Sequence, residues 1–326
     1  MSRPYYIFSN GRIFRKENTV YFENEKGEKK AIPVEDIDVI HLFGEVNLNT
    51  RLLNFISQQN KPIHIYNYYG YYSGSFMPKN RAISGALTVR QVEHYLDFEK
   101  RIFIARRFVE GALFHMARNL RHYSETEQFV EVIEKEMANI PLAKNIPELM
   151  SCEGRAKDAY YQAFNRVLRA DFTLEKREKR PPSNPVNALI SFGNAMVYSL
   201  VLSEIYHTQL NPTVSYLHEP GEKRYSLSLD LAEIFKPLIA DSIIFKLIND
   251  NMINLHDFEK DVGYCYLNED GRKKFVQEFD KKISTTVKHR KLKRKTSYRT
   301  LIRIECYKLI KHLLGDEVYS PFKAWW

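Results

Sequence analysis

One short stretch of the chain brings together side chains that bind divalent metal ions. A loop sequence at residues 216–221 contains His218, and the segment that follows contains Asp230 and Glu233. The Pro-Gly pair just after the histidine is a turn signal, so we expect His218 to lie on a loop ahead of a helix. One imidazole and two carboxylates can together bind one divalent cation. This spacing therefore predicts a metal site.

The helix after this loop must position both carboxylates. Apolar residues recur every three or four positions from 227 to 238, which is the period of an amphipathic helix. Ser226 precedes them and is placed to cap the first turn. On such a helix Asp230 lies at the edge of the apolar stripe, and Glu233 lies beside it. We therefore expect both carboxylates to point toward the core boundary, where one ligand can contact them together.

A further carboxylate, Glu153, lies on the apolar side of a separate helical segment. An ionised carboxylate that is half buried costs on the order of several kcal/mol unless it is paired or bound to a metal. Metal binding is one way to compensate these carboxylates. Salt bridges from Arg155, Lys157 and Arg224 are the other, and the spacing alone leaves both open.

The types of donor indicate which metal suits the site. Carboxylate oxygens with one imidazole favour Mg²⁺ or Mn²⁺, whereas zinc favours cysteine or several histidines. The chain has three cysteines, at positions 152, 265 and 306, and none is paired by its spacing with another. We expect an octahedral, water-rich site for Mg²⁺ or Mn²⁺. The cysteines are expected to be free thiols in a cytoplasmic protein.

The pattern of the chain changes at about residue 85, which predicts two domains and an α+β fold. Residues 1–85 indicate a small β-sandwich-like domain, and residues 86–326 indicate a larger all-α domain that carries the metal-site residues. The expected strands are residues 5–8, 19–22, 38–42, 63–66 and 71–76, with one helix at 49–58.

The charge of the chain suits a nucleic-acid partner. The 326 residues include 49 Lys and Arg against 40 Asp and Glu, a net charge of +9. This excess favours attraction to phosphate, with an affinity that falls as salt rises. Two basic runs are the candidates for DNA contact, although either could be an ordinary solvated surface. They contain Lys288, Arg290, Lys291, Lys293, Arg294 and Lys295 in one run and Arg177 and Arg180 in the other.

Two segments each allow a second interpretation. The tyrosine-rich residues 66–72 could stack on unpaired bases, but a β-hairpin is the favoured interpretation. Residues 187–206 are the most apolar long segment, but polar residues interrupt them, so we expect a buried core helix and no membrane span. The N-terminus shows no apolar signal region, in line with the cytoplasmic expectation.

Three motifs, in this order, resemble those of the CRISPR-associated endonuclease family that serves as the spacer integrase of CRISPR adaptation. The first is Cys-Glu-Gly-Arg-Ala at residues 152–156, and the second is Asn-Pro-Val-Asn-Ala-Leu-Ile-Ser-Phe-Gly at 184–193. The third is Leu-His-Glu-Pro-Gly at 217–221, with the helix that follows it. The runs at 41–46 and 61–65 are more loosely similar to the family's first domain. The resemblance spans nearly the whole chain.

The resemblance assigns roles by position. The family's metal-binding Glu falls on Glu153 and its His on His218. The third ligand is an Asp or Glu in the helix after the His motif, and this sequence offers two. We favour Glu233 as the ligand and Asp230 as an accessory carboxylate, so that these four residues form the expected catalytic set.

The resemblance also implies an activity and partners. The activity is metal-dependent insertion of short DNA fragments into a CRISPR array, by attack of a 3′-hydroxyl on a phosphodiester. The expected partners are double-stranded DNA of the fragment and the repeat, a second copy of the chain bound through the N-terminal domain, and a small second CRISPR adaptation protein.

Two other functions stay open. One is a stand-alone, metal-dependent, structure-specific nuclease of DNA repair, which would use the same site. The other is a non-catalytic DNA-binding subunit with a vestigial site. The presence of all four site residues argues against the second, because unused clustered carboxylates are costly.

Overall fold

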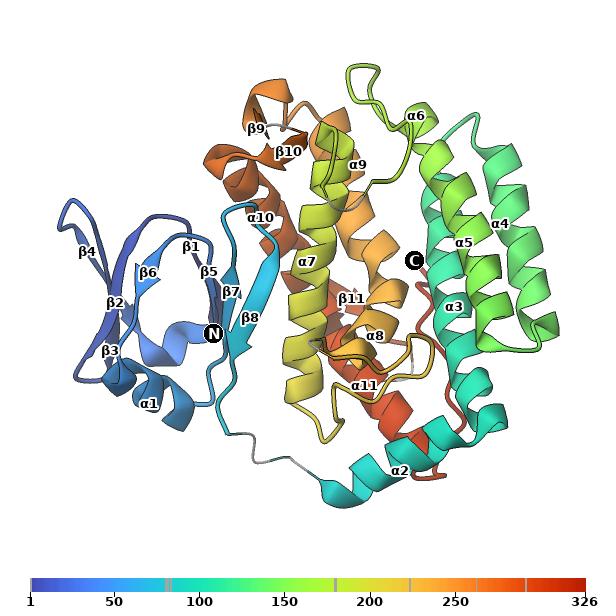
Figure 1. Ribbon diagram of the computed structural model, residues 1–326, viewed down its shortest axis with the longest axis horizontal. Helices are drawn as coiled ribbons and strands as arrows, with labels where there is room; N and C mark the ends of the chain where they lie inside the picture. The colour runs from blue at the N-terminus through green and yellow to red at the C-terminus, as the bar shows by residue number, and fades with distance from the viewer. Residues whose placement is uncertain are drawn as a thin grey trace. The chain divides into compact units, whose positions relative to one another are not determined.

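The computed structural model describes residues 2–79, 82, 84–178, 181–222, 224–261, 263–290 and 292–326. The chain divides into two compact units, Met1–Arg81 and Ala82–Trp326, close to the division expected at residue 85. Strands dominate the first unit and helices the second (Figure 1). The predicted α+β class, with a β-rich N-terminal part and a mostly helical remainder, is confirmed.

In its described residues the N-terminal unit contains two four-stranded sheets and one α-helix. One sheet has the order β1-β5-β7-β8, with β1, β5 and β7 parallel, and the other has the order β4-β3-β2-β6. Helix α1 is capped by Asn49, whose side chain accepts a bond from Leu52 N. The elements are β1 (Arg3–Ile7), β2 (Gly11–Lys16), β3 (Thr19–Asn24), β4 (Lys29–Pro33), β5 (Ile37–Leu42), β6 (Val46–Asn47), α1 (Thr50–Gln58), β7 (Ile63–Tyr66) and β8 (Tyr72–Phe76).

The core of this unit is aliphatic. Ile13, Val20, Ile40 and Ile56 are almost completely buried in it. Strands β1, β3, β5, β7 and β8 correspond to the predicted ones. Strands β2, β4 and β6 were not predicted, because they are short or rich in charged residues and give little apolar alternation.

The tyrosine-rich tract forms the β7–β8 hairpin, as expected. The two strands pair antiparallel, and the Asn67 carboxamide oxygen accepts from Tyr69 N at 3.1 Å and from Tyr71 N at 2.9 Å. Gly70 has a φ of +82°, a conformation that favours glycine. The turn chemistry of this tract therefore accounts for the hairpin.

The second unit is a helical assembly around α8. Helix α8 packs against α7 on one side and α3 on the other, and α3 also packs against α4 and α5 (Figure 1). The helices are α2 (Gly85–Leu96), α3 (Phe98–Leu120), α4 (Glu127–Asn139), α5 (Ile146–Gln162), α6 (Phe164–Val167), α7 (Pro185–Tyr206), α8 (Ser226–Lys236), α9 (Ser242–Asn249), α10 (Glu269–Ser284) and α11 (Tyr298–Leu313).

This unit differs from the all-α expectation in one respect. Its described residues include two short antiparallel hairpins, of β9 (Phe258–Asp261) with β10 (Tyr264–Leu267), and of β11 (Thr286–Lys288) with β12 (Lys295–Ser297). Strands of three or four residues are too short to give a periodic apolar signal. Their small size leaves the unit mostly helical.

Helix α7 contains the apolar segment, residues 187–206, that was expected to be a buried core helix and not a membrane span. Of the helices in the described residues, α7 alone is long and apolar enough to span a membrane, and 78% of its most apolar window is buried. It also carries Glu204, which is fully buried and accepts from Arg299 Nε at 2.6 Å and Arg303 Nε at 2.7 Å of α11. Such a compensated buried charge fits a helix packed in a protein core.

The C-terminal segment after α11 is connected to α8 by hydrogen bonds through the His115 ring of α3. Ala324 N donates to His115 Nε2 at 3.1 Å, and His115 Nδ1 donates to Ile234 O of α8 at 2.9 Å. Burial lowers the pKa of His115 to about 3, so its ring is neutral and bridges the two groups in a single tautomer. Hydrogen bonds through His115 thus hold α8 against α3 and against the C-terminal segment.

Candidate functional site

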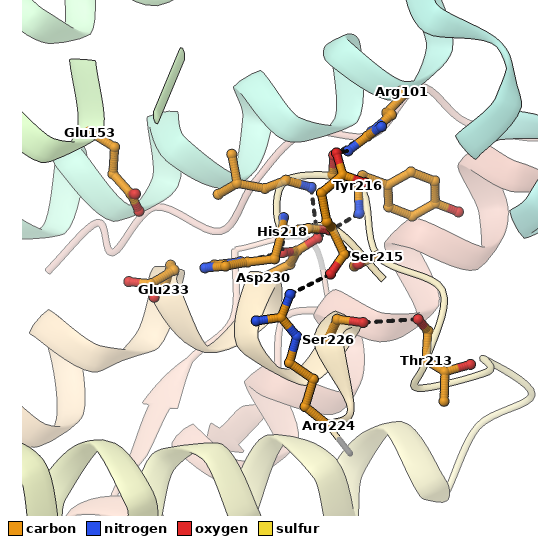
Figure 2. A network of polar contacts seen from close by, with 12 residues as sticks. Arg101, Glu153, Thr213, Ser215, Tyr216, His218, Arg224, Ser226, Asp230 and Glu233 are labelled. Atoms are coloured by element: carbon orange, nitrogen blue, oxygen red, sulfur yellow. Dashed lines mark hydrogen bonds and ion pairs between the residues drawn. The ribbon is translucent and has the colours of Figure 1, made fainter. Parts of the chain in front are cut away.

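Asp230 of α8 fixes the loop that carries His218 (Figure 2). Its carboxylate is completely buried. Tyr216 N at 2.7 Å and Leu217 N at 3.0 Å donate to Oδ2, and His218 N at 3.0 Å donates to Oδ1. The His218 ring lies 2.7 Å from Oδ1 through Nδ1. Asp230 is therefore directed at the loop, and the expectation that it shares a ligand directly with Glu233 does not match this geometry.

The bond to Asp230 determines which nitrogen of His218 is available. A carboxylate only accepts hydrogen bonds, so Nδ1 carries the proton and Nε2 is left for a ligand or a proton. Figure 2 shows the far edge of this ring pointing toward Glu233. Burial lowers the pKa of His218, but the bond to Asp230 and the nearby Glu233 and Glu153 carboxylates raise it, and the net shift is upward.

Glu219 anchors the same loop from its outer side. Arg101 Nη2 of α3 donates to Glu219 Oε1 at 2.6 Å, and Tyr95 OH of α2 donates to Oε2 at 2.8 Å. Arg101 Nε also donates to Tyr216 O at 3.0 Å. The loop is held between α8 on one side and α2 and α3 on the other, so His218 is positioned before any substrate arrives.

The start of α8 differs from the prediction. Tyr225 is the N-cap residue, and its side chain makes no capping hydrogen bond. Ser226 is instead the first helical residue, and its hydroxyl donates to Thr213 O at 2.9 Å. The predicted Ser226 cap is therefore wrong, because the hydroxyl bonds the preceding loop rather than the backbone of its own helix.

Glu153 of α5 and Glu233 of α8 meet through the ammonium group of Lys157. Lys157 Nζ lies 2.9 Å from Glu153 Oε1 and 3.0 Å from Glu233 Oε2, and both carboxylate side chains are 6% exposed. A second ammonium, that of Lys236, lies 2.6 Å from Glu233 Oε1. Two carboxylates from different helices are thus brought together around one cationic group.

The salt-bridge alternative can now be resolved residue by residue. Lys157 does contact Glu153 and Glu233, as described. Arg155 points the other way and pairs with Glu136 of α4, with bonds of 2.8 and 2.7 Å. Arg224 donates to Glu219 O at 2.6 Å. Of the three basic residues considered, Lys157 is the one that neutralises the site carboxylates.

The charges at this cluster stabilise one another. Burial raises the pKa of Glu233, but the Lys157 and Lys236 ammonium groups lower it by a larger amount. The net pKa of Glu233 is therefore well below its usual value. Burial lowers the pKa of Lys157, while Glu233 and Glu153 raise it, and the net shift is upward. Glu233 is therefore a carboxylate, and Lys157 an ammonium, at neutral pH.

The donor set suits a divalent metal, but its members are not yet gathered around one point. In the described part of the chain, no three His, Cys, Asp or Glu side chains converge closely enough to hold a metal ion. Lys157 stands between the two carboxylates. In the part of the chain that the structure describes, Glu153 Oε1 is buried and accepts no hydrogen bond, although the Lys157 ammonium lies 2.9 Å away, so this oxygen has capacity for a ligand. Glu153, Glu233 and His218 Nε2 therefore fit Mg²⁺ or Mn²⁺ provided that the ammonium moves away.

Sequence reasoning did not find Lys236 or Arg101. Lys236 could have been found, since a basic residue three positions after a carboxylate on a helix forms a pair with it. Arg101 gave no signal, because its partners Tyr216 and Glu219 are more than a hundred residues away in the chain.

The first basic run lies on the hairpin β11–β12 and the turn between its strands. Lys288, Arg290, Lys293, Arg294 and Lys295 are all exposed there, and the guanidinium carbon of Arg290 lies 5.5 Å from the centre of the Trp325 ring. Lys291, from the same run, lies outside the described residues. This surface is available for phosphate contact.

The second basic run is arranged differently. Arg177 is half buried and donates to Asn187 Oδ1 at 2.9 Å and to Ser191 Oγ at 3.0 Å, both on α7. Its guanidinium therefore attaches the loop to α7. Arg180 lies outside the described residues.

Comparison with known proteins places this geometry in a family. The family model described as CRISPR associated protein Cas1 matches residues 5–281. A CRISPR-associated endonuclease Cas1 of Thermodesulfovibrio yellowstonii is 70% identical over 324 residues, which cover 99% of this chain and 100% of the relative.

Solved structures agree in fold. A Cas1 protein from Thermotoga maritima superposes with a TM-score of 0.89 at 40% identity, covering 98% of this chain and 100% of that one. A casposase bound to integration product has a TM-score of 0.89 at 19% identity, covering 98% and 93%. A chain of a Cas6-RT-Cas1–Cas2 complex has a TM-score of 0.84 at 16% identity, covering 100% of this chain and 36% of that one.

Proposed function

The chain belongs to the CRISPR-associated Cas1 family, and on this premise we propose that it is a metal-dependent DNA endonuclease and integrase. It inserts short DNA fragments into a CRISPR array by transesterification. Its relatives are named CRISPR-associated endonucleases, which supports nuclease chemistry. The casposase of the same fold, bound to integration product, supports the joining reaction.

One observation carries the proposal. Glu153 on α5, Glu233 on α8 and His218 on the preceding loop lie at one site, although 80 positions separate the first from the last (Figure 2). The carboxylates are almost fully buried and already held around a cation. Two buried carboxylates with an imidazole nearby supply the types of ligand that a metal-dependent phosphoryl-transfer enzyme uses.

The residues of the chain take separate roles in this proposal. Glu153, Glu233 and His218 Nε2 would hold Mg²⁺ or Mn²⁺, which, when bound, polarises the phosphoryl oxygen and stabilises the leaving oxygen. Asp230 keeps Nε2 of His218 directed into the site, where it serves as a ligand or moves a proton. Lys236 adds positive charge next to Glu233, which would favour a phosphate at the site.

The proposed partners follow from the same family. The fold neighbour from a Cas6-RT-Cas1–Cas2 complex supports a second, small adaptation protein as partner. Double-stranded DNA of the fragment and of the repeat is the proposed substrate. We also propose a homodimer through the N-terminal unit and a cytoplasmic location.

Strand transfer in vitro tests the proposed function. A labelled short duplex is incubated with supercoiled plasmid that carries a CRISPR repeat, Mn²⁺, the protein and the small partner. Joined product is expected with a duplex that has 3′-hydroxyl ends. An otherwise identical duplex with 3′-dideoxy ends should give none. Nicking without joining would favour the stand-alone nuclease. DNA binding with neither reaction would favour the non-catalytic subunit.

Neutralising the basic hairpin should weaken DNA binding. Replacing Lys291, Lys293, Arg294 and Lys295 with alanine is expected to lower the affinity for duplex DNA at low salt. The slope of log affinity against log salt should decrease by up to about 0.9 for each phosphate that the variant no longer neutralises. Fluorescence anisotropy across a salt series measures both quantities.

A matched variant controls for total charge. Lys16, Lys26, Lys29 and Lys30 are exposed in the N-terminal unit, and replacing these four with alanine removes the same charge elsewhere. The hairpin is not the DNA-binding surface if its variant keeps the wild-type affinity and salt slope, or if the control variant shows an equal decrease in both.

A further inference from the structure

Lys157 lies where the proposed ligands would meet. Its ammonium group contacts Glu153 one helical turn earlier on α5 and Glu233 on α8. Among the residues that the structure describes, no other cation is in ion-pair contact with both carboxylates. Lys236 contacts Glu233 but not Glu153. Lys157 thus bridges the two helices through the same two carboxylates that would hold a metal ion.

The two carboxylates require such a bridge when no metal is bound. Each carboxylate side chain is only 6% exposed, so water screens the repulsion between the two negative charges only weakly. A buried charge without a partner strongly destabilises a fold. Lys157 supplies the compensating charge from within the chain, and its ammonium lies 2.9 Å from Glu153 Oε1 and 3.0 Å from Glu233 Oε2.

The same position makes Lys157 an obstacle to the metal. A divalent ion needs the carboxylate oxygens that the ammonium now contacts, and it would be repelled by a positive charge at this distance. The Lys157 side chain retains 25% of its exposure, and its four-carbon stem is flexible. Part of the Lys157 side chain thus reaches solvent, and its flexible stem allows the ammonium to move off the carboxylates.

We infer that Lys157 is an internal counter-cation that competes with the divalent ion for Glu153 and Glu233 and is displaced when the ion binds. The inference rests on the proposed function, because that function requires the ion. Binding becomes an exchange of one cation for another. The metal-free protein stays stable, and its affinity for the ion is lower than the donor set alone would give.

Mn²⁺ binding to the DNA-free, full-length protein tests this exchange. Isothermal titration calorimetry compares the wild type with Lys157→Met and, as a matched control, Lys236→Met. Removal of the competitor should tighten the dissociation constant for Mn²⁺ by at least about tenfold. Lys236→Met removes the same charge from one carboxylate only and should have a smaller effect. Equal or weaker binding by Lys157→Met, or equal tightening by both variants, would overturn the inference.

Thermal unfolding supplies a second readout. In EDTA the midpoint of Lys157→Met should lie below that of the wild type, because the two carboxylates no longer share a counter-charge. Saturating Mn²⁺ should raise the midpoint of the variant more than that of the wild type. If Lys157→Met does not fold in EDTA, Lys157→Gln, which keeps a hydrogen-bond donor, is measured instead. A variant midpoint that is unchanged in EDTA contradicts the counter-cation role.

These results also separate the inference from the proposed function. A wild type that binds no Mn²⁺ at millimolar concentration would overturn both. A wild type that binds Mn²⁺ and loses the site in Glu153→Gln, but is indifferent to Lys157→Met, would overturn only the inference.

Discussion

Replacing Glu153 with glutamine should lower the rate of DNA strand transfer by at least about 100- to 1,000-fold, the range seen when a group that stabilises a transition state is removed. Glutamine keeps the shape of the side chain but removes the charge, so the site loses one of its two nearly buried anionic donors. Glu233→Gln should behave in the same way. Single-turnover formation of joined product, at saturating Mn²⁺, measures the effect.

A neighbouring carboxylate provides the control for this prediction. Glu136 is also buried and paired, but with Arg155, on the side of α5 away from Glu233. Glu136→Gln should lower stability through the broken ion pair and leave the rate of strand transfer near that of the wild type. A Glu153→Gln protein that joins DNA at the rate of the Glu136→Gln control would show that Glu153 does not serve the reaction.

Asp230→Asn should be the most damaging single substitution for the architecture of the site. The two carboxylate oxygens accept from three backbone N–H groups and from the His218 ring. In either orientation the asparagine would turn an NH₂ donor toward N–H donors and leave them unsatisfied in the interior. We expect the free energy of unfolding to fall by more than about 2 kcal/mol. Strand transfer should fall about 10- to 100-fold, as for other residues that orient a metal ligand.

Urea denaturation and single-turnover kinetics measure the two effects of Asp230→Asn. Glu219→Gln is the matched control, because Glu219 holds the same loop from outside and its side chain is 65% exposed. An exposed pair of this kind contributes at most about 1 kcal/mol. Equal losses in the two variants would contradict a special role for Asp230.

Much of the candidate site could be predicted from the sequence. The turn at the Pro-Gly pair and the apolar period that follows place His218 on a loop and Glu233 on a helix, and the structure agrees. The apolar alignment of Glu153 on its helix also agrees with its burial. These are local signals, since each depends on residues within a few turns of the same segment.

The remaining features depend on contacts between distant segments. The local sequence already favours Lys157 over Arg155 as the partner of Glu153, because Lys157 follows it by four positions on the same helix. The contact of Lys157 with Glu233 depends on how distant segments come together. His115 makes hydrogen bonds to Ile234 of α8 and to Ala324 near the C-terminus, and each partner is more than a hundred positions from His115. The role of Asp230 was likewise hidden, because its partners are backbone groups whose positions the loop sequence does not reveal.

The most direct test of the central claim is strand transfer by His218→Ala. A short duplex with 3′-hydroxyl ends, a supercoiled plasmid with a CRISPR repeat, Mn²⁺ and the small partner protein are combined with the wild type, with His218→Ala, or with His256→Ala, which replaces an exposed histidine. We predict that the wild type and His256→Ala form joined product and that His218→Ala, while folded, does not. Joining by His218→Ala at the wild-type rate would contradict the assignment of the chemistry to this site.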